Sequence, residues 1–173
     1  FDQGTYSQTA GDVIEMTVNL EDTDDGYVQI GDEDSGFIDV LYVEDDDDDD
    51  EVTFEVNTRT IGTGASFDAV YNTEDDIVES EIHGGLSADN QAVYENADGV
   101  QLSAPGSAGT GSFEAYLHNL DLIDTSNSED GTDQLIRPLQ ATTYDVSVNG
   151  ANTFIVNDDD NSELQDELDL ATL

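Results

Sequence analysis

The chain lacks lysine and cysteine entirely, and among its 173 residues only Arg59 and Arg137 carry a permanent positive charge. The absence of cysteine excludes disulfides. Two arginines cannot neutralise a track of phosphates, which opposes nucleic-acid binding. No apolar run approaches the length of a membrane span, and the first residues, FDQGTYSQTAGD, are not a signal peptide. We therefore expect any export signal or membrane anchor to lie in regions outside this chain.

Acidic residues are abundant in the chain. Its 43 Asp and Glu residues give a formal net charge of −41 at pH 7, and they occur in every segment. Such self-repulsion destabilises a compact fold in dilute buffer, whereas at 1 M salt the screening length falls to about 3 Å. Hydrated carboxylates also keep a protein soluble. The composition therefore indicates a protein of an extreme halophile. The competing interpretations are a nucleic-acid mimic and a high-capacity calcium buffer.

The first half of the chain has the pattern of short β-strands. In DVIEMTVNL, residues 12–20, apolar and polar residues alternate, which is the period of a half-buried strand. Acidic or glycine-bearing turns separate further predicted strands at 27–30, 37–43, 52–58, 66–71 and 76–83. Regular turns without alternating helices favour an all-β fold, an antiparallel β-sandwich of immunoglobulin-like type.

The strand pattern stops at residues 84–138, where turn-forming residues dominate. We interpret this segment as a loop-rich insertion carrying one short helix. Ser112 can cap that helix, and the apolar residues after it follow helical spacing: Phe113, Tyr116, Leu117 and Leu120. The chain is then a single domain, residues 1–173, whose sandwich core is formed by about 1–83 and 139–173.

Alternation returns late in the chain. Tyr144, Val146 and Val148 lead into Asn149-Gly150, a hairpin signal, which is followed by Phe154 and Val156. Tyr144 also lies at the start of a late predicted strand, a sequence position that suits the tyrosine corner of immunoglobulin-like sandwiches. We therefore expect a hairpin over 142–156 and a closing strand near 167–173.

Several acidic turns offer the oxygen ligands that Ca²⁺ and Mg²⁺ prefer. Loops at the same end of a sandwich can meet, and neighbouring carboxylates without lysine repel one another unless a cation joins them. The sequence therefore predicts a Ca²⁺ or Mg²⁺ site among three clusters: Asp22 with Asp24, then Asp46, Asp48 and Asp50, and finally Asp158 with Asp160. The alternative for each cluster is a solvated turn of a halophilic protein.

Few other residues are candidates for catalysis or metal binding. Glu79, Glu81 and His83 are spaced for one face of a predicted strand, which suits either a transition metal or a solvated strand face. No nucleophile elbow occurs, and no glycine-rich loop is followed by the lysine that phosphate binding requires. We therefore predict that the domain is not an enzyme.

Three stretches together resemble a known family: AGDVIEMTVNLEDTDDGYVQIGDED, then VEDDDDDDEVTFEVNTRTIGTG, and finally PLQATTYDVSVNG with ELDLATL. They are similar to the immunoglobulin-like domain repeated in haloarchaeal cell-surface proteins, the group that includes surface-layer glycoproteins. The resemblance covers residues 1–64 and 138–173, and it implies a secreted, extracellular module with a structural or adhesive role. No asparagine here begins an N-glycosylation sequon, so N-linked sugar is not expected.

The expected function is a structural module of a halophilic archaeal surface assembly: a surface layer, a filament or a stalk. Identical or similar subunits are expected to associate through strand edges, with Phe1–Thr9 or the closing LDLATL segment as candidates. Inorganic cations screen the acidic surfaces between them. Two alternatives stay open, namely an adhesin whose 84–138 insertion binds a ligand and an accessory domain of a secreted hydrolase.

Overall fold

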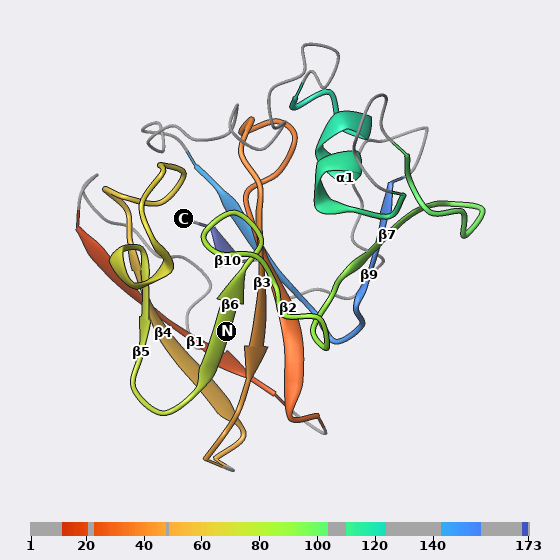
Figure 1. Cartoon of the computed structure of the whole chain (residues 1–173). Coiled ribbons are helices and arrows are strands. Elements are labelled where there is room, and N and C mark those ends of the chain that lie inside the picture. Colours follow the sequence, from red (N-terminus) through yellow and green to blue (C-terminus); the bar gives the residue numbers. More distant parts are fainter. Residues whose placement is uncertain are drawn as a thin grey trace.

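The computed structural model describes residues 12–20, 23–47, 49–103, 110–123, 143–156 and 171–172. Figure 1 shows how the elements are arranged. In chain order they are β1 (Val13–Asn19), β2 (Asp25–Ile30), β3 (Asp39–Glu44), β4 (Glu51–Asn57), the 3-10 helix η1 (Phe67–Ala69), β5 (Tyr71–Thr73), β6 (Ile77–Ser80), β7 (Val93–Asn96), α1 (Phe113–Asn119), β8 (Asp145–Asn149), β9 (Thr153–Val156) and β10 (Ala171–Thr172).

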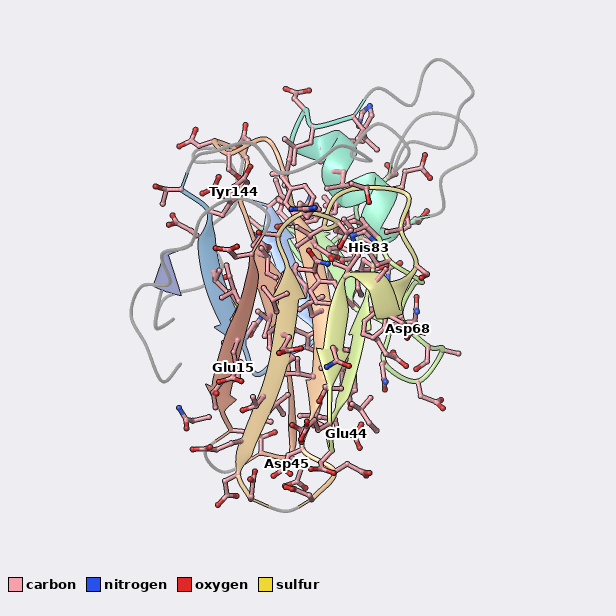
Figure 2. All side chains as sticks on the ribbon, turned by 90° about the vertical axis from the view of Figure 1, so that its left-hand side faces the viewer. Glu15, Glu44, Asp45, Asp68, His83 and Tyr144 are labelled. Carbon is pink, nitrogen blue, oxygen red and sulfur yellow. The ribbon has the colours of Figure 1, made fainter. Side chains whose placement is uncertain are left out.

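Two antiparallel sheets pack face to face as a sandwich (Figure 2). One sheet has the strand order β1-β4-β5, and the other has the order β10-β8-β2-β3-β6. β10 lies where the closing strand is expected and pairs with β8. The prediction of an all-β sandwich with one short helix is therefore confirmed, whereas its immunoglobulin-like type stays a prediction.

The first core lies between the two sheets. In β1 and the residue after it, the even-numbered side chains are buried and the odd-numbered ones face outward, as the alternation in the sequence predicts. The core is formed largely by Ile14, Met16, Val18 and Leu20 with Val52, Phe54 and Val56 from one sheet, and by Val28, Ile30, Leu41 and Val43 from the other.

The segment 66–71 differs from the predicted strand. Phe67–Ala69 forms a turn of 3-10 helix, in which the Ala69 N–H donates to the Ser66 carbonyl and the Val70 N–H donates to the Phe67 carbonyl. This turn brings the Phe67 ring to 5.5 Å from the Tyr71 ring, measured between centroids. Strand β5 begins only at Tyr71, because packing of the two rings outweighs the local preference for extended backbone.

A second core covers the outer face of the five-stranded sheet. β2 and β3 bury residues on both faces, and Tyr27, Val40 and Tyr42 pack in one cluster with residues of α1, β7 and β9. Figure 1 shows these three elements on one side of the five-stranded sheet. Aromatic rings fill this core: Tyr94 stacks on Tyr116 with centroids 4.7 Å apart, and Tyr94 lies 5.4 Å from Phe154. The described part of the 84–138 segment is therefore a packed layer of the domain.

Helix α1 begins where the sequence predicts. The Ser112 side chain accepts a hydrogen bond from the Ala115 N–H at 3.1 Å, which caps the helix. Its apolar stripe is buried in the second core, as the helical spacing indicates: Phe113, Tyr116, Leu117 and Leu120. Strand β7, within the same segment, is an element that the sequence does not reveal.

The hairpin predicted over 142–156 is wrong. β8 and β9 follow one another closely, but β8 pairs with β2 and β10, whereas β9 pairs in parallel with β7. The turn between them is held by Asn149, whose side chain accepts from the Ala151 N–H and donates to the Thr153 carbonyl. Burial decides this outcome, because pairing with β7 places Phe154 and Val156 in the second core.

A buried polar network joins the two sheets. Asp39 of β3 is fully buried, and its Oδ2 accepts hydrogen bonds from the Tyr71 hydroxyl of β5 at 2.8 Å and from the Ser80 hydroxyl of β6 at 2.7 Å. Burial raises the pKa of Asp39, while the hydrogen bonds from Ser80 and Tyr71 oppose that rise. Because Tyr71 and Asp39 belong to different sheets, their hydrogen bond fixes one sheet against the other.

Candidate functional site

Acidic turns gather at one end of the sandwich. The β1–β2, β3–β4 and β5–β6 connections all lie there, and Figure 2 shows Glu44 and Asp45 at this lower end. One hydrogen bond joins the β1–β2 and β3–β4 connections, and another joins the β5–β6 connection to β4. The Asp45 N–H donates to the Asp24 carbonyl at 2.9 Å, and the Thr53 N–H donates to the Asp76 Oδ2 at 3.0 Å.

Three carboxylates from two of these connections form a cluster. Each of Asp45, Asp47 and Asp76 places one carboxylate oxygen within 4.8 Å of the others. Backbone hydrogen bonds orient Asp45, since its Oδ1 accepts from the Asp47 N–H at 3.1 Å and its Oδ2 accepts from the Asp50 N–H at 2.8 Å. Asp50 adopts a left-handed backbone conformation with φ of 64°, which Asp tolerates better than most residues.

The electrostatics of this cluster are unfavourable for bare carboxylates. The Oδ1 atom of Asp76 has less than 1 Å² of exposed surface and takes no hydrogen bond. The pKa of Asp47 is raised by local desolvation and by repulsion from other carboxylates, which include Asp49, Asp45 and Asp76. Arg59 lies beyond the far end of β4, so within the described ranges no arginine side chain adjoins the cluster.

The candidate ligands predicted from the sequence are only partly placed. Asp24, Asp46 and Asp50 lie in the connections at this end, but the cluster consists of Asp45, Asp47 and Asp76 instead. Asp22, Asp48, Asp158 and Asp160 lie outside the described residues. Sequence reasoning missed Asp76 because its turn follows a short strand. The available signal was topological, since the β5–β6 and β3–β4 turns of such a sandwich share one end.

The triplet Glu79, Glu81 and His83 does not come together. β6 ends at Ser80, so the chain turns between Glu79 and His83. Glu79 accepts from the Ser87 N–H at 2.8 Å, while Glu81 accepts from the Tyr94 hydroxyl at 3.0 Å. His83 is buried, and its Nε2 accepts from the Gly62 N–H at 3.1 Å. These hydrogen bonds hold the three side chains to separate parts of the fold.

Glu81 is expected to make stability depend on pH. Burial, with a further contribution from Asp39, raises its pKa from 4.5 to about 7, although the hydrogen bond from Tyr94 opposes the rise. The stability contributed by protonated Glu81 is complete below its unfolded-state pKa and is lost as the pH rises through the folded-state value. Glu81→Gln keeps an acceptor for Tyr94 without titrating. As the pH rises from 4.5 to above 7, we expect the free energy of unfolding of the variant to increase by about 3 kcal/mol relative to that of the wild type.

Urea unfolding in molar KCl, measured from acidic to mildly alkaline pH, tests the role of Glu81. The two proteins should converge in acid and diverge as the pH rises. Parallel pH profiles for the two proteins would contradict a titrating Glu81.

Comparisons with known proteins place the chain in a family. The model of a family described as "Domain of unknown function (DUF7827)" matches residues 1–109. The chain belongs to this family. It is 33% identical over 86 residues to Cell surface glycoprotein 1 of Haloarcula hispanica, which covers 49% of the chain and 9% of that protein. It is 38% identical over 82 residues to the Cell surface glycoprotein of Haloferax gibbonsii, which covers 47% of the chain and 10% of that protein.

These relatives support a domain of a haloarchaeal cell-surface protein, located outside the cell. The matched segment spans about a tenth of each relative's length. No solved structure matches the chain. Among the described residues, no helix is long and apolar enough to cross a membrane.

Proposed function

We propose that this family member is a structural, non-catalytic module of a surface layer, filament or stalk of a halophilic archaeon. The observation that carries the proposal is its similarity to segments of two haloarchaeal cell surface glycoproteins. The net charge of −41 fits this role, because the module meets molar salt directly on the cell surface. Inorganic cations screen its acidic faces and allow copies to approach.

The edge of β1 is the contact that we propose for association. The Thr58 N–H donates to the Asp12 carbonyl, and the Leu20 N–H donates to the Asp50 carbonyl. Because β1 and β4 pair without a break between these bonds, the backbone groups of the odd-numbered residues point away from β4. Among the described residues, β1 is the longest strand at a sheet edge. An edge of this kind accepts another strand.

Charge limits the registers that such pairing can adopt. Of the outward-directed residues Val13, Glu15, Thr17 and Asn19, only Glu15 is charged. If two β1 strands pair in antiparallel fashion about a twofold axis at Met16, Glu15 lies opposite Thr17 of the second copy. A twofold axis at Glu15 would instead oppose two like charges, which is destabilising. Because Met16 is the middle residue of Val13–Asn19, a twofold axis at Met16 also pairs the whole strand, and we therefore propose the Met16-centred register.

Cross-linking tests this register in a chain that contains no cysteine. The double variant Glu15→Cys/Thr17→Cys is expected to form a disulfide-linked dimer in molar KCl, because opposed residues of a hydrogen-bonded pair lie about 5.5 Å apart at Cα. Non-reducing electrophoresis and mass spectrometry measure the product.

The matched control is Thr53→Cys/Glu55→Cys in β4. These residues pair with Thr17 and Glu15 in the register of the sheet, and both double variants lose the hydroxyl contact of 2.9 Å between Thr17 and Thr53. The control additionally loses the hydrogen bond that Glu55 accepts from the exposed Asn72 side chain. β4 is paired on both sides and should not cross-link. Equal dimer yields from the two variants, or a monomer in both, would overturn association through β1.

A further inference from the structure

We propose that Asn149 is a site at which the folded domain modifies itself, losing its side-chain amide to become aspartate or isoaspartate. Asn149-Gly150 is the turn between β8 and β9, which Figure 1 shows in blue below β9. Asn149 is the only asparagine of the chain that is followed by glycine. Three features of this turn, described below, favour attack of the backbone on the side chain.

The backbone nitrogen of Gly150 is available as the nucleophile. Gly150 is exposed, and among the described residues its N–H has no hydrogen-bond partner. A Cβ built at Gly150 would meet no atom within 4 Å, so the turn is open on that side. Glycine also lets the backbone rotate widely, which brings its nitrogen toward the preceding side chain.

The side-chain amide of Asn149 is polarised as the electrophile. Its Oδ1 accepts a hydrogen bond from the Ala151 N–H at 3.0 Å. Negative charge develops on this oxygen when a nucleophile adds to Cγ, and a backbone N–H already aimed at the oxygen stabilises that charge. The hydrogen bond from Nδ2 to the Thr153 carbonyl, at 3.1 Å, is the restraint that breaks before the amide leaves.

Water is the only co-reactant that the modification needs. The Gly150 nitrogen loses its proton to the solvent and bonds to Cγ of Asn149, and the bond from Cγ to Nδ2 then breaks. Nδ2 takes up a proton and departs as ammonia, which leaves a cyclic succinimide. Water adds to a carbonyl carbon of this ring and breaks its bond to the ring nitrogen. Opening at Cγ gives aspartate, and opening at the backbone carbonyl gives isoaspartate.

The fold protects other dipeptides that could form the same ring. Asp25-Gly26 lies within β2, where Gly26 is buried. In Asp98-Gly99 the glycine N–H donates to the Asn96 carbonyl at 2.9 Å, so this nitrogen is occupied. An ionised carboxylate also resists nucleophilic attack, whereas a neutral amide does not. In the described ranges, an unpaired glycine nitrogen therefore follows a side-chain amide only at Asn149-Gly150.

The modification is expected to weaken the turn between β8 and β9. Aspartate at position 149 keeps an acceptor for the Ala151 N–H but no longer donates to the Thr153 carbonyl. Isoaspartate also adds a methylene group to the backbone of the turn. Because β9 carries Phe154 and Val156 into the second core, we expect the modified domain to be less stable.

Peptide mapping by liquid chromatography and mass spectrometry tests the proposal. The domain is incubated in molar KCl at mildly alkaline pH, with circular dichroism to verify that it is folded, and is sampled over weeks. We expect Asn149 to convert progressively to two products of equal mass, aspartate and isoaspartate, which chromatography separates. Asn152 is the internal control, because it is exposed in the same turn but is followed by the branched Thr153. Equal conversion of Asn149 and Asn152, or no conversion of Asn149, would overturn the site.

Gly150→Ala tests the assignment of the nucleophile. Alanine fits the folded turn, because the space around Gly150 is open and its backbone is not left-handed. Its methyl group crowds the attacking nitrogen, so we expect conversion of Asn149 to slow by about tenfold, which corresponds to about 1.4 kcal/mol in the barrier. An unchanged rate would contradict attack by this nitrogen.

Two further measurements separate the role of the folded turn from that of the dipeptide. A parallel incubation in urea measures the unfolded chain, and conversion confined to urea would overturn self-modification of the folded domain. Asn149→Asp has the side chain of the aspartate product and should unfold at a lower urea concentration than the wild type. Equal midpoints would overturn the expected weakening of the turn. None of these measurements requires association through β1, so the two proposals fail separately.

Discussion

Asp39→Ala is expected to lower the free energy of unfolding by about 3 kcal/mol, because it leaves two buried hydroxyls, those of Tyr71 and Ser80, without their acceptor. The methyl group also leaves a small cavity in the core. Asp39→Asn should cost less, since its amide oxygen can take the place of Oδ2 and still accept both hydrogen bonds. Urea unfolding in molar KCl, followed by circular dichroism, measures both variants.

The exposed residue Asp68 supplies the control for Asp39. Asp68→Ala removes the same charge and should change the free energy of unfolding by about 0.5 kcal/mol or less. If Asp39→Ala were no more destabilising than Asp68→Ala, the buried network would not hold the two sheets together. Tyr71→Phe should fall between these variants, because it removes only the hydrogen bond that crosses between the sheets.

Phe154→Ala is expected to destabilise the whole domain by about 3–5 kcal/mol, the range for removing a buried aromatic side chain. Phe154 is fully buried in the second core, and its ring lies 5.4 Å from Tyr94 and 6.0 Å from Tyr27. Tyr27 belongs to the five-stranded sheet, so the loss should reach the sandwich as well as the α1 layer. Near-ultraviolet and far-ultraviolet circular dichroism should report one shared transition, displaced to lower denaturant.

The outcome for Phe154→Ala also decides how the domain is organised. Two separate transitions would show that the α1 layer unfolds independently of the sandwich. Val100→Ala is the control, because Val100 is 59% exposed and its truncation should change stability by about 0.5 kcal/mol or less.

The burial pattern of a strand could be predicted from the sequence where one face of the strand is exposed to solvent. In β1 the side chains of Glu15 and Asn19 are exposed while Met16 and Val18 are buried, and this alternation is written directly in the sequence. β2 and β3 were found as apolar runs, but their burial on both faces was not foreseen, because a short apolar run does not reveal what covers it. β7 was missed for a related reason, since its partner β9 lies 60 positions later, from Val93 to Thr153.

The candidate site was predictable only in its location. The run Asp45–Asp50 marks a turn rich in oxygen ligands, and the sequence correctly suggested that turns at one end could meet. Which carboxylates converge depends on the path of the turn. Asp45 points inward to accept two backbone N–H groups, and Asp50 adopts a left-handed conformation. Neither feature has a signature in a run of identical residues, and the third member, Asp76, is contributed by another turn.

The parallel pairing of β7 with β9 has a consequence for how this molecule is made. Val93 can meet Thr153 only after the chain between them has been synthesised, and a parallel partner cannot be supplied by a neighbouring hairpin. Closing so long a loop delays folding, because the entropy of closure is lost before the contacts form. The aromatic surface of β2 and β3 can therefore be covered completely only after β9 has been synthesised.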